Sequence, residues 1–119
     1  MSGAKTYTGG CHCGEVRFEV TTDLANVVAC NCSICQKRGA LWSFVPSAHF
    51  ALRAGADALK DYQFGKKSLH HLFCPQCGVA AFSRGITPKG NEMVAVNVRC
   101  LDEVDLVALK PAPFDGRSL

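Results

Sequence analysis

Cysteine is the residue whose spacing most clearly suggests chemistry in this chain of 119 residues, which contains eight of them. Seven fall into three short groups, Cys11/Cys13 in GGCHCG, Cys30/Cys32/Cys35 in CNCSIC and Cys74/Cys77 in CPQCG, and Cys100 stands alone. Two cysteines close together on a tight turn can bind one metal ion through their thiolates. In CPQCG, Pro75 restricts the turn, and Gly78 can adopt the left-handed conformation that lets the chain leave it. The grouping therefore predicts metal sites, with zinc as the metal.

Seven grouped cysteines suggest two different zinc sites. A closed structural site uses four protein ligands, whereas a catalytic site uses three and leaves one position for water or substrate. Spacing alone leaves two partitions open. In the first, Cys32/Cys35 join Cys74/Cys77 and leave Cys11, Cys13 and Cys30; in the second, Cys11/Cys13 join Cys74/Cys77 and leave Cys30, Cys32 and Cys35. We favour the second, because it keeps each local group on a single metal ion.

The compartment decides between metal sites and disulfides. The opening MSGAKTYTGG lacks the apolar segment of a secretory signal, and no apolar run approaches the roughly 18 residues of a membrane span. We therefore expect a cytoplasmic protein that does not enter a membrane. Clustered cysteines in a reducing cytosol are typical of metal ligands, and a disulfide framework is the alternative interpretation.

The formal charge of +3 does not indicate a nucleic-acid partner. Seven thiolates with two Zn²⁺ ions would together carry three negative charges and cancel it. Lysine and arginine are also dispersed, with small clusters only at Lys37-Arg38 and Lys66-Lys67. The length predicts one zinc-binding domain over residues 1–119, and the 48% hydrophobic content allows a modest core.

The hydrophobic pattern predicts a mainly β domain of short antiparallel strands, with cysteine knuckles at the turns. The clearest strand follows Gly14, where Val16, Phe18 and Val20 alternate with polar residues. Further strands are expected at 26–30, 41–45, 49–53, 60–64, 69–73, 79–83 and 93–98, with Gly65-Lys66-Lys67 as a hairpin turn. Helix is expected only for a turn or two after Cys32 and over 54–59. The tail KPAPFDGRSL, with two prolines, is expected to be irregular.

The segments GGCHCGEVRFEV, CNCSICQKRG and FCPQCG, in this order, resemble the family of glutathione-dependent formaldehyde-activating enzymes, which includes a centromere protein V-like branch. The resemblance runs from about Gly9 to the NVRCLD stretch near Cys100. It implies a β-tent fold with two zinc ions per chain and a carbon–sulfur lyase activity that joins glutathione to formaldehyde as S-hydroxymethylglutathione. It also implies a structural zinc at Cys11, Cys13, Cys74 and Cys77, and a catalytic-type zinc at Cys30, Cys32 and Cys35.

Charge suggests which residues would meet the substrate. Three thiolates around Zn²⁺ carry a net negative charge, and glutathione is itself an anion, so nearby cations are needed. Lys37 and Arg38, directly after Cys35, are the expected substrate contacts. His70 and His71 lie in a strand pattern, so one is expected to face inward and the other outward. Cys100 is expected to be a buried apolar residue rather than a ligand.

Three functions remain open at this point. The chain is a zinc-dependent lyase if a fourth, accessible position of the second site has affinity for a thiol. It is a zinc-stapled binding module if a fourth protein ligand closes that site. It is a thiol-redox or zinc-responsive sensor if mild oxidation reversibly releases zinc without thiol turnover. The sequence does not identify the thiol, the aldehyde, the proton donor or the oligomeric state.

Overall fold

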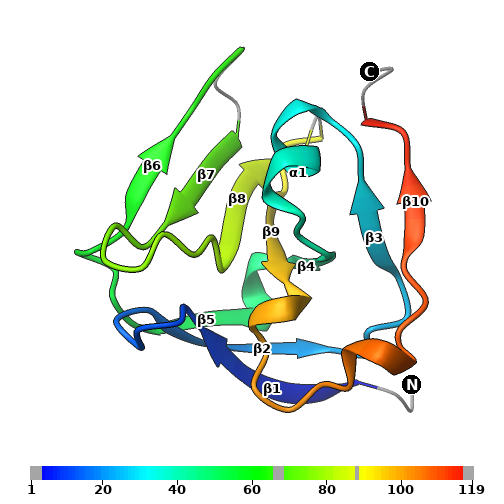
Figure 1. Ribbon diagram of the computed structural model, residues 1–119, viewed down its shortest axis with the longest axis horizontal. Helices are drawn as coiled ribbons and strands as arrows, with labels where there is room; N and C mark the ends of the chain where they lie inside the picture. The colour runs from blue at the N-terminus through cyan, green and yellow to red at the C-terminus, as the bar shows by residue number, and fades with distance from the viewer. Residues whose placement is uncertain (1–3, 66–68, 88, 117–119) are drawn as a thin grey trace.

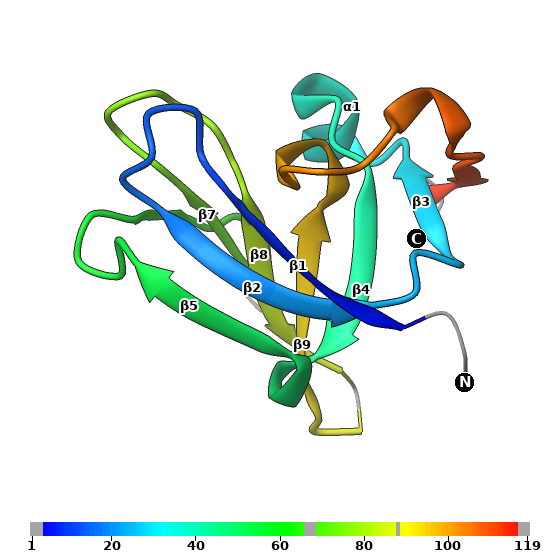
Figure 2. The same cartoon turned by 90° about the horizontal axis from the view of Figure 1, so that it is seen from below.

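Two β-sheets meet at a steep angle in the computed structural model, which describes residues 4–65, 69–87 and 89–116 (Figure 1). The smaller sheet has the strand order β1-β2-β5, and the larger has the order β10-β3-β4-β9-β8-β7-β6. Seen from below, the small sheet crosses the wall formed by the large one (Figure 2). The prediction of a mainly β fold is confirmed. In the part of the chain that the structure describes, no helix has the length and apolar character needed to cross a membrane.

The small sheet is antiparallel and forms the base of the molecule. It consists of β1 (Lys5–Gly10), β2 (Arg17–Thr22) and β5 (Phe50–Ala54). In β2, Phe18 and Val20 face the interior and are almost fully buried, as their alternation predicts. Strand β1 was not expected from the sequence. It ends at Gly9 and Gly10. A Cβ atom on Gly9 would lie 2.6 Å from the carbonyl oxygen of Cys100, so only glycine allows these two backbone segments to approach so closely.

The large sheet carries most of the residues that surround the cysteines. Its strands are β3 (Val27–Cys30), β4 (Trp42–Pro46), β6 (Lys60–Tyr62), β7 (Leu69–Phe73), β8 (Phe82–Ile86), β9 (Glu92–Asn97) and β10 (Ala112–Phe114). All neighbouring pairs are antiparallel except β10, which runs parallel to β3. Helix α1 (Ser33–Arg38) follows β3, and short 3-10 turns occur at η1 (Ser47–His49), η2 (Val98–Cys100) and η3 (Leu106–Ala108).

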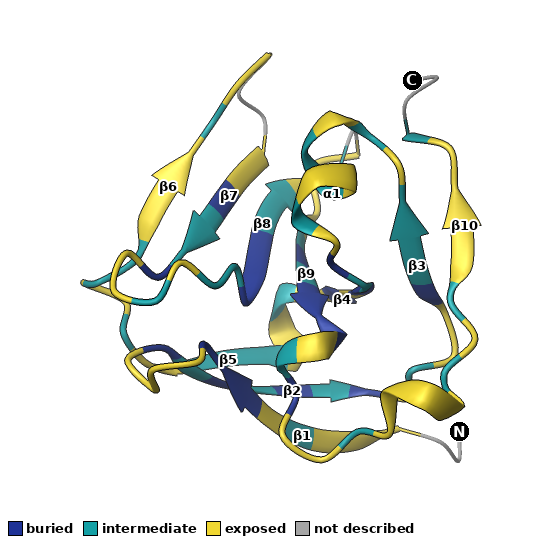
Figure 3. Cartoon of the chain, in the orientation of Figure 1, coloured by how far each residue is buried: buried dark blue, intermediate teal, exposed yellow. Residues whose placement is uncertain are grey.

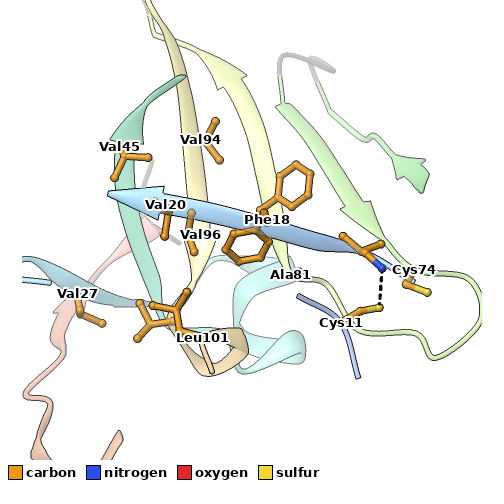
Figure 4. Packing of buried hydrophobic residues seen from close by; sticks show 13 residues of the cluster. Cys11, Phe18, Val20, Val27, Val45, Cys74, Ala81, Val94, Val96 and Leu101 are labelled. Carbon is orange, nitrogen blue, oxygen red and sulfur yellow. Dashed lines mark hydrogen bonds between the residues drawn. The ribbon is translucent and has the colours of Figure 1, made fainter. Parts of the chain in front are cut away.

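The core lies between the two sheets (Figure 4). The rings of Phe18, Phe50 and Phe82 meet there, with centroids 4.7 to 6.0 Å apart. Val94 and Val96 of β9 complete it from the large sheet and are fully buried. Each such side chain contributes on the order of 1.5–3 kcal/mol when removed from water. Cys11 and Cys74 belong to the same buried cluster, so one cysteine group borders the core directly.

Two sequence-based expectations about the elements are wrong. Residues 54–59 form a turn, not a helix, because Gly55 has φ of +93° and its carbonyl accepts hydrogen bonds from the N–H groups of Ala58 and Leu59. The tail is not wholly irregular, because it contains β10. The strand expected at 79–83 begins at Phe82 instead. The expected hairpin turn falls partly on residues 66–68, outside the described residues, although β6 and β7 pair as a hairpin would require.

Candidate functional site

Four cysteines from the beginning and the later part of the chain meet at one point, and we call them the four-cysteine cluster (Cys11, Cys13, Cys74 and Cys77). Their Sγ atoms all lie within 4.8 Å of one another. The Sγ atom of Cys13 is 3.6 Å from that of Cys11 and 3.6 Å from that of Cys74. Tetrahedral zinc with Zn–S bonds of about 2.3 Å places its sulfurs about 3.8 Å apart. The cluster therefore fits one tetrahedrally coordinated metal ion.

Two backbone knuckles hold these four thiols. In the first knuckle, the Val16 N–H donates to Cys11 Sγ over 3.3 Å, which is the dashed line in Figure 4. The Cys11 N–H donates in return to the Val16 carbonyl over 3.1 Å. In the second knuckle, the N–H of Gly78 donates to the Cys74 carbonyl over 2.7 Å, and Gly78 has the expected left-handed φ of +79°. Local hydrogen bonding thus positions the thiols of both knuckles.

Backbone donors and crowding act in opposite directions on these thiols. The N–H groups of Cys13 and Val79 lower the pKa of Cys77 to about 6. Burial raises the pKa of Cys11, but the Val16 N–H and neighbouring thiols outweigh it, so the net shift is downward. The Glu15 N–H lowers the pKa of Cys13, but burial and the adjacent thiols raise it to about 12. Four crowded thiolates need a compensating cation, which agrees with a metal site.

The remaining group is compact in sequence as well as in space, and we call it the three-cysteine cluster (Cys30, Cys32 and Cys35). Cys30 ends β3, Cys32 is the N-cap residue of α1, and Cys35 lies in the first turns of that helix. Their Sγ atoms also lie within 4.8 Å of one another, and all three residues are half-buried. Within residues 4–65, 69–87 and 89–116, no histidine, aspartate or glutamate joins this group as a fourth ligand.

Helix α1 and strand β4 supply the donors to this cluster. The Cys32 N–H lies 3.4 Å from Cys30 Sγ, and the indole Nε1–H of the buried Trp42 donates to Cys35 Sγ over 3.2 Å. Burial raises the pKa of Cys32, but N–H groups of Cys35 and Ile34 and the neighbouring thiols reverse this and lower it. Burial and the Cys32 thiol raise the pKa of Cys35 to about 12. The cluster can hold a metal ion through three thiolates.

The chain's tail covers one side of the three-cysteine cluster. Strand β10 pairs with β3 so that Phe114 lies opposite Cys30, and the Asn31 N–H donates to the Phe114 carbonyl over 3.1 Å. Figure 3 shows β10 exposed along the edge of β3. At Gly116, a Cβ atom would lie only 2.7 Å from Cys30 Sγ. Sequence reasoning missed this contact, because nothing local in the two-proline tail signals a parallel pairing 84 positions away.

A hollow of about 430 Å³ lies along α1. It is lined by Ser33, Ile34, Lys37, Arg38, Tyr62 and Phe64. Lys37 and Arg38, the cations expected to contact substrate, therefore both line a cavity on the helix that carries Cys35, although no cysteine lines it. The Nη1 atom of Arg38 is buried and has no hydrogen-bond partner among the described residues, and burial lowers the pKa of this guanidinium. Tyr62 and Phe64 were not singled out from the sequence.

The histidine pair faces inward and outward as expected, whereas Cys100 is less buried than expected. His71 is buried, whereas the exposed His70 contacts Asp61 through Nδ1 at 2.7 Å. Burial and the nearby Arg38 lower the pKa of His71, which favours the neutral imidazole. Cys100 is half-buried and joins neither cluster among the described residues. Burial raises its pKa to about 11, which suits an unreactive thiol.

Comparison with known proteins agrees with the two cysteine clusters. A family model described as glutathione-dependent formaldehyde-activating enzyme matches residues 6–113, a range that includes all seven clustered cysteines. A crystal structure of a protein from Rhodobacter sphaeroides is similar to this chain with a TM-score of 0.79 and 33% sequence identity. That similarity covers 89% of this chain and 97% of the Rhodobacter chain.

Proposed function

This chain belongs to the glutathione-dependent formaldehyde-activating enzyme family, and we propose on that basis that it is a zinc-dependent carbon–sulfur lyase. In this proposal it binds two zinc ions. One is structural at Cys11, Cys13, Cys74 and Cys77, and the other is catalytic at Cys30, Cys32 and Cys35. The substrates are glutathione with formaldehyde, or a related thiol adduct. The observation that carries the proposal is a group of three thiols with no fourth ligand among the described residues, on a helix that also carries two cations lining a hollow.

The reaction balances without an oxidant or reductant. A thiol sulfur donates an electron pair to the formaldehyde carbon, the carbon–oxygen π bond breaks, and the thiol's proton ends on the new hydroxyl oxygen. The reverse reaction breaks the same carbon–sulfur bond and returns the proton to sulfur. A zinc ion bound at the three-cysteine cluster would supply the Lewis acidity that keeps an incoming thiol deprotonated near neutral pH.

Residues of the chain itself prepare this site for an anionic thiol. The Trp42 indole N–H and the backbone N–H groups of α1 donate to the sulfurs, which disperses their negative charge. Lys37 and Arg38 place positive charge in the adjoining hollow. Because an isolated three-thiolate zinc site carries a net charge of −1, these cations would offset its repulsion of a substrate carboxylate.

Exchange of ¹³C-formaldehyde with glutathione, followed by NMR, tests the proposal. Zinc-loaded protein should speed formation and cleavage of S-hydroxymethylglutathione above the rate in buffer. The Cys32→Ala variant should return to the buffer rate, and the matched Cys100→Ala variant should keep the activity, because Cys100 lies outside both clusters. If the protein with two zinc ions gives only the buffer rate, this reaction is not its function.

A further inference from the structure

The hollow along α1 has the position and size of a substrate subsite. Ser33 and Ile34, which line it, lie in sequence between the proposed ligands Cys32 and Cys35, and the charge of Arg38 in its wall interacts with Cys35. The hollow is therefore near the three-cysteine cluster, although none of the three cysteines lines it. Its volume of about 430 Å³ falls within the range of about 300–1,000 Å³ that is usual for small-molecule sites. Whatever thiol binds at the cluster would have room to extend its remaining atoms here.

One wall of the hollow is a stack of aromatic rings. The ring centroids of Tyr62 and Phe64 are 5.7 Å apart at 29°, and those of Phe64 and His71 are 5.2 Å apart at 20°. His71 is only 8% exposed, whereas Tyr62 and Phe64 are 50% and 41% exposed. The stack thus has one buried ring and two rings that present apolar surface to the hollow. Offset stacking on such rings favours a flat ligand group.

Helix α1 contributes a positive charge to the hollow that forms no ion pair with a carboxylate of the described residues. Arg38 Nη1 is buried and has no hydrogen-bond partner among the described residues. Because Nη1 itself is closed to solvent, a ligand would meet the remainder of the guanidinium, where Arg38 lines the hollow. Guanidinium groups bind carboxylates through two parallel hydrogen bonds, and Lys37 on the same helix adds a second positive charge.

We propose that this hollow selects thiols, or their adducts, that carry both an aromatic or otherwise planar group and a carboxylate. The planar group would stack on Tyr62 and Phe64, and the carboxylate would pair with Arg38. Glutathione provides carboxylates but no aromatic ring, so it would use only part of the hollow. This inference rests on the proposed function, because it assumes that an external thiol binds at the three-cysteine cluster.

Isothermal titration calorimetry of the full, zinc-loaded protein tests the inference with four thiols. The probes are 4-(mercaptomethyl)benzoate, benzyl mercaptan, 6-mercaptohexanoate and glutathione. The aromatic acid should bind about tenfold more tightly than the aliphatic acid, as expected for a stacked ring. Arg38→Gln should weaken binding of both acids about tenfold and leave benzyl mercaptan unchanged.

The Tyr62→Leu variant should abolish the preference for the aromatic acid while glutathione binding stays the same. Tyr7→Leu is the matched control, because Tyr7 lies on β1, away from the hollow. If thiols bind with no aromatic preference, or if Tyr62→Leu leaves that preference intact, the inference is overturned and the lyase proposal stands. If none of the four thiols binds the zinc-loaded protein, both are overturned.

Discussion

The two cysteine clusters are built from the same side chain but differ in how the chain brings their members together. The four-cysteine cluster joins residues that are 61 positions apart, such as Cys13 and Cys74, and it includes two residues of the buried core. The three-cysteine cluster spans Cys30 to Cys35, is half-buried, and lies against the tail. A metal ion at the first would close a long loop, whereas one at the second constrains a segment that is already local.

The largest effect should come from breaking the four-cysteine cluster. Structural zinc can contribute on the order of 10 kcal/mol, which equals the whole stability of many small domains. Cys77→Ala should therefore give unfolded or insoluble protein, as measured by circular dichroism and metal content, while Cys100→Ala folds normally. A well-folded Cys77→Ala protein with unchanged zinc content would show that this cluster is not a structural site.

The same substitution in the three-cysteine cluster should have a smaller effect on folding. We expect Cys32→Ala to remain folded and retain one zinc ion per chain, with a loss of about 1–3 kcal/mol in the free energy of unfolding. Thiol binding should disappear, because Cys32 contributes one of only three ligands within the described residues. Thermal denaturation and zinc analysis measure both effects. Collapse of the fold in this variant would remove the distinction between the clusters.

Acidification should separate the clusters by their metal release. The pKa of Cys77 is lowered from an ordinary 9.0 to about 6. Its thiolate therefore stabilises the folded, metal-binding state fully above pH 9.0, and this stabilisation is lost as the pH falls through about 6. Each cluster contains thiols shifted in both directions, because the pKa values of Cys13 and Cys35 are both raised to about 12 and those of Cys11 and Cys32 are both lowered. Protons should nevertheless displace zinc from the three-cysteine cluster first, because it offers three thiolates where the other cluster offers four. A chromogenic zinc chelator records this as two steps, and release in the opposite order would contradict it.

The smallest effect should come from the tail contact. Gly116→Ala would place a Cβ atom 2.7 Å from Cys30 Sγ, but the end of the chain can shift to relieve it. We expect zinc affinity at the three-cysteine cluster to fall by about tenfold or less. The four-cysteine cluster serves as the internal control, because its metal retention should not change. Equal weakening of both clusters in competition with a chelator would exclude this local explanation.

Sequence reasoning was most successful where the signal is local. The spacing of Cys30, Cys32 and Cys35, the CPQCG knuckle and the alternation around Phe18 each reside within a few positions, and the structure brings the cysteines together in the favoured partition. The pairing of β10 with β3, the unexpected strand β1 and the turn at Gly55 depend on contacts with distant segments. Tyr62 and Phe64 line the same hollow as α1 although they are distant from it in the sequence, so no local pattern reveals the aromatic wall.

Zinc-edge X-ray absorption tests most directly whether the three-cysteine cluster accepts an external thiol. Protein with both clusters loaded should average about 3.5 sulfurs per zinc, from one site of four and one of three, and glutathione should raise this average towards four. Cys32→Ala protein, with only the four-cysteine cluster loaded, should start near four sulfurs and show no change. An average of four before glutathione is added, or no increase afterwards, would contradict the account.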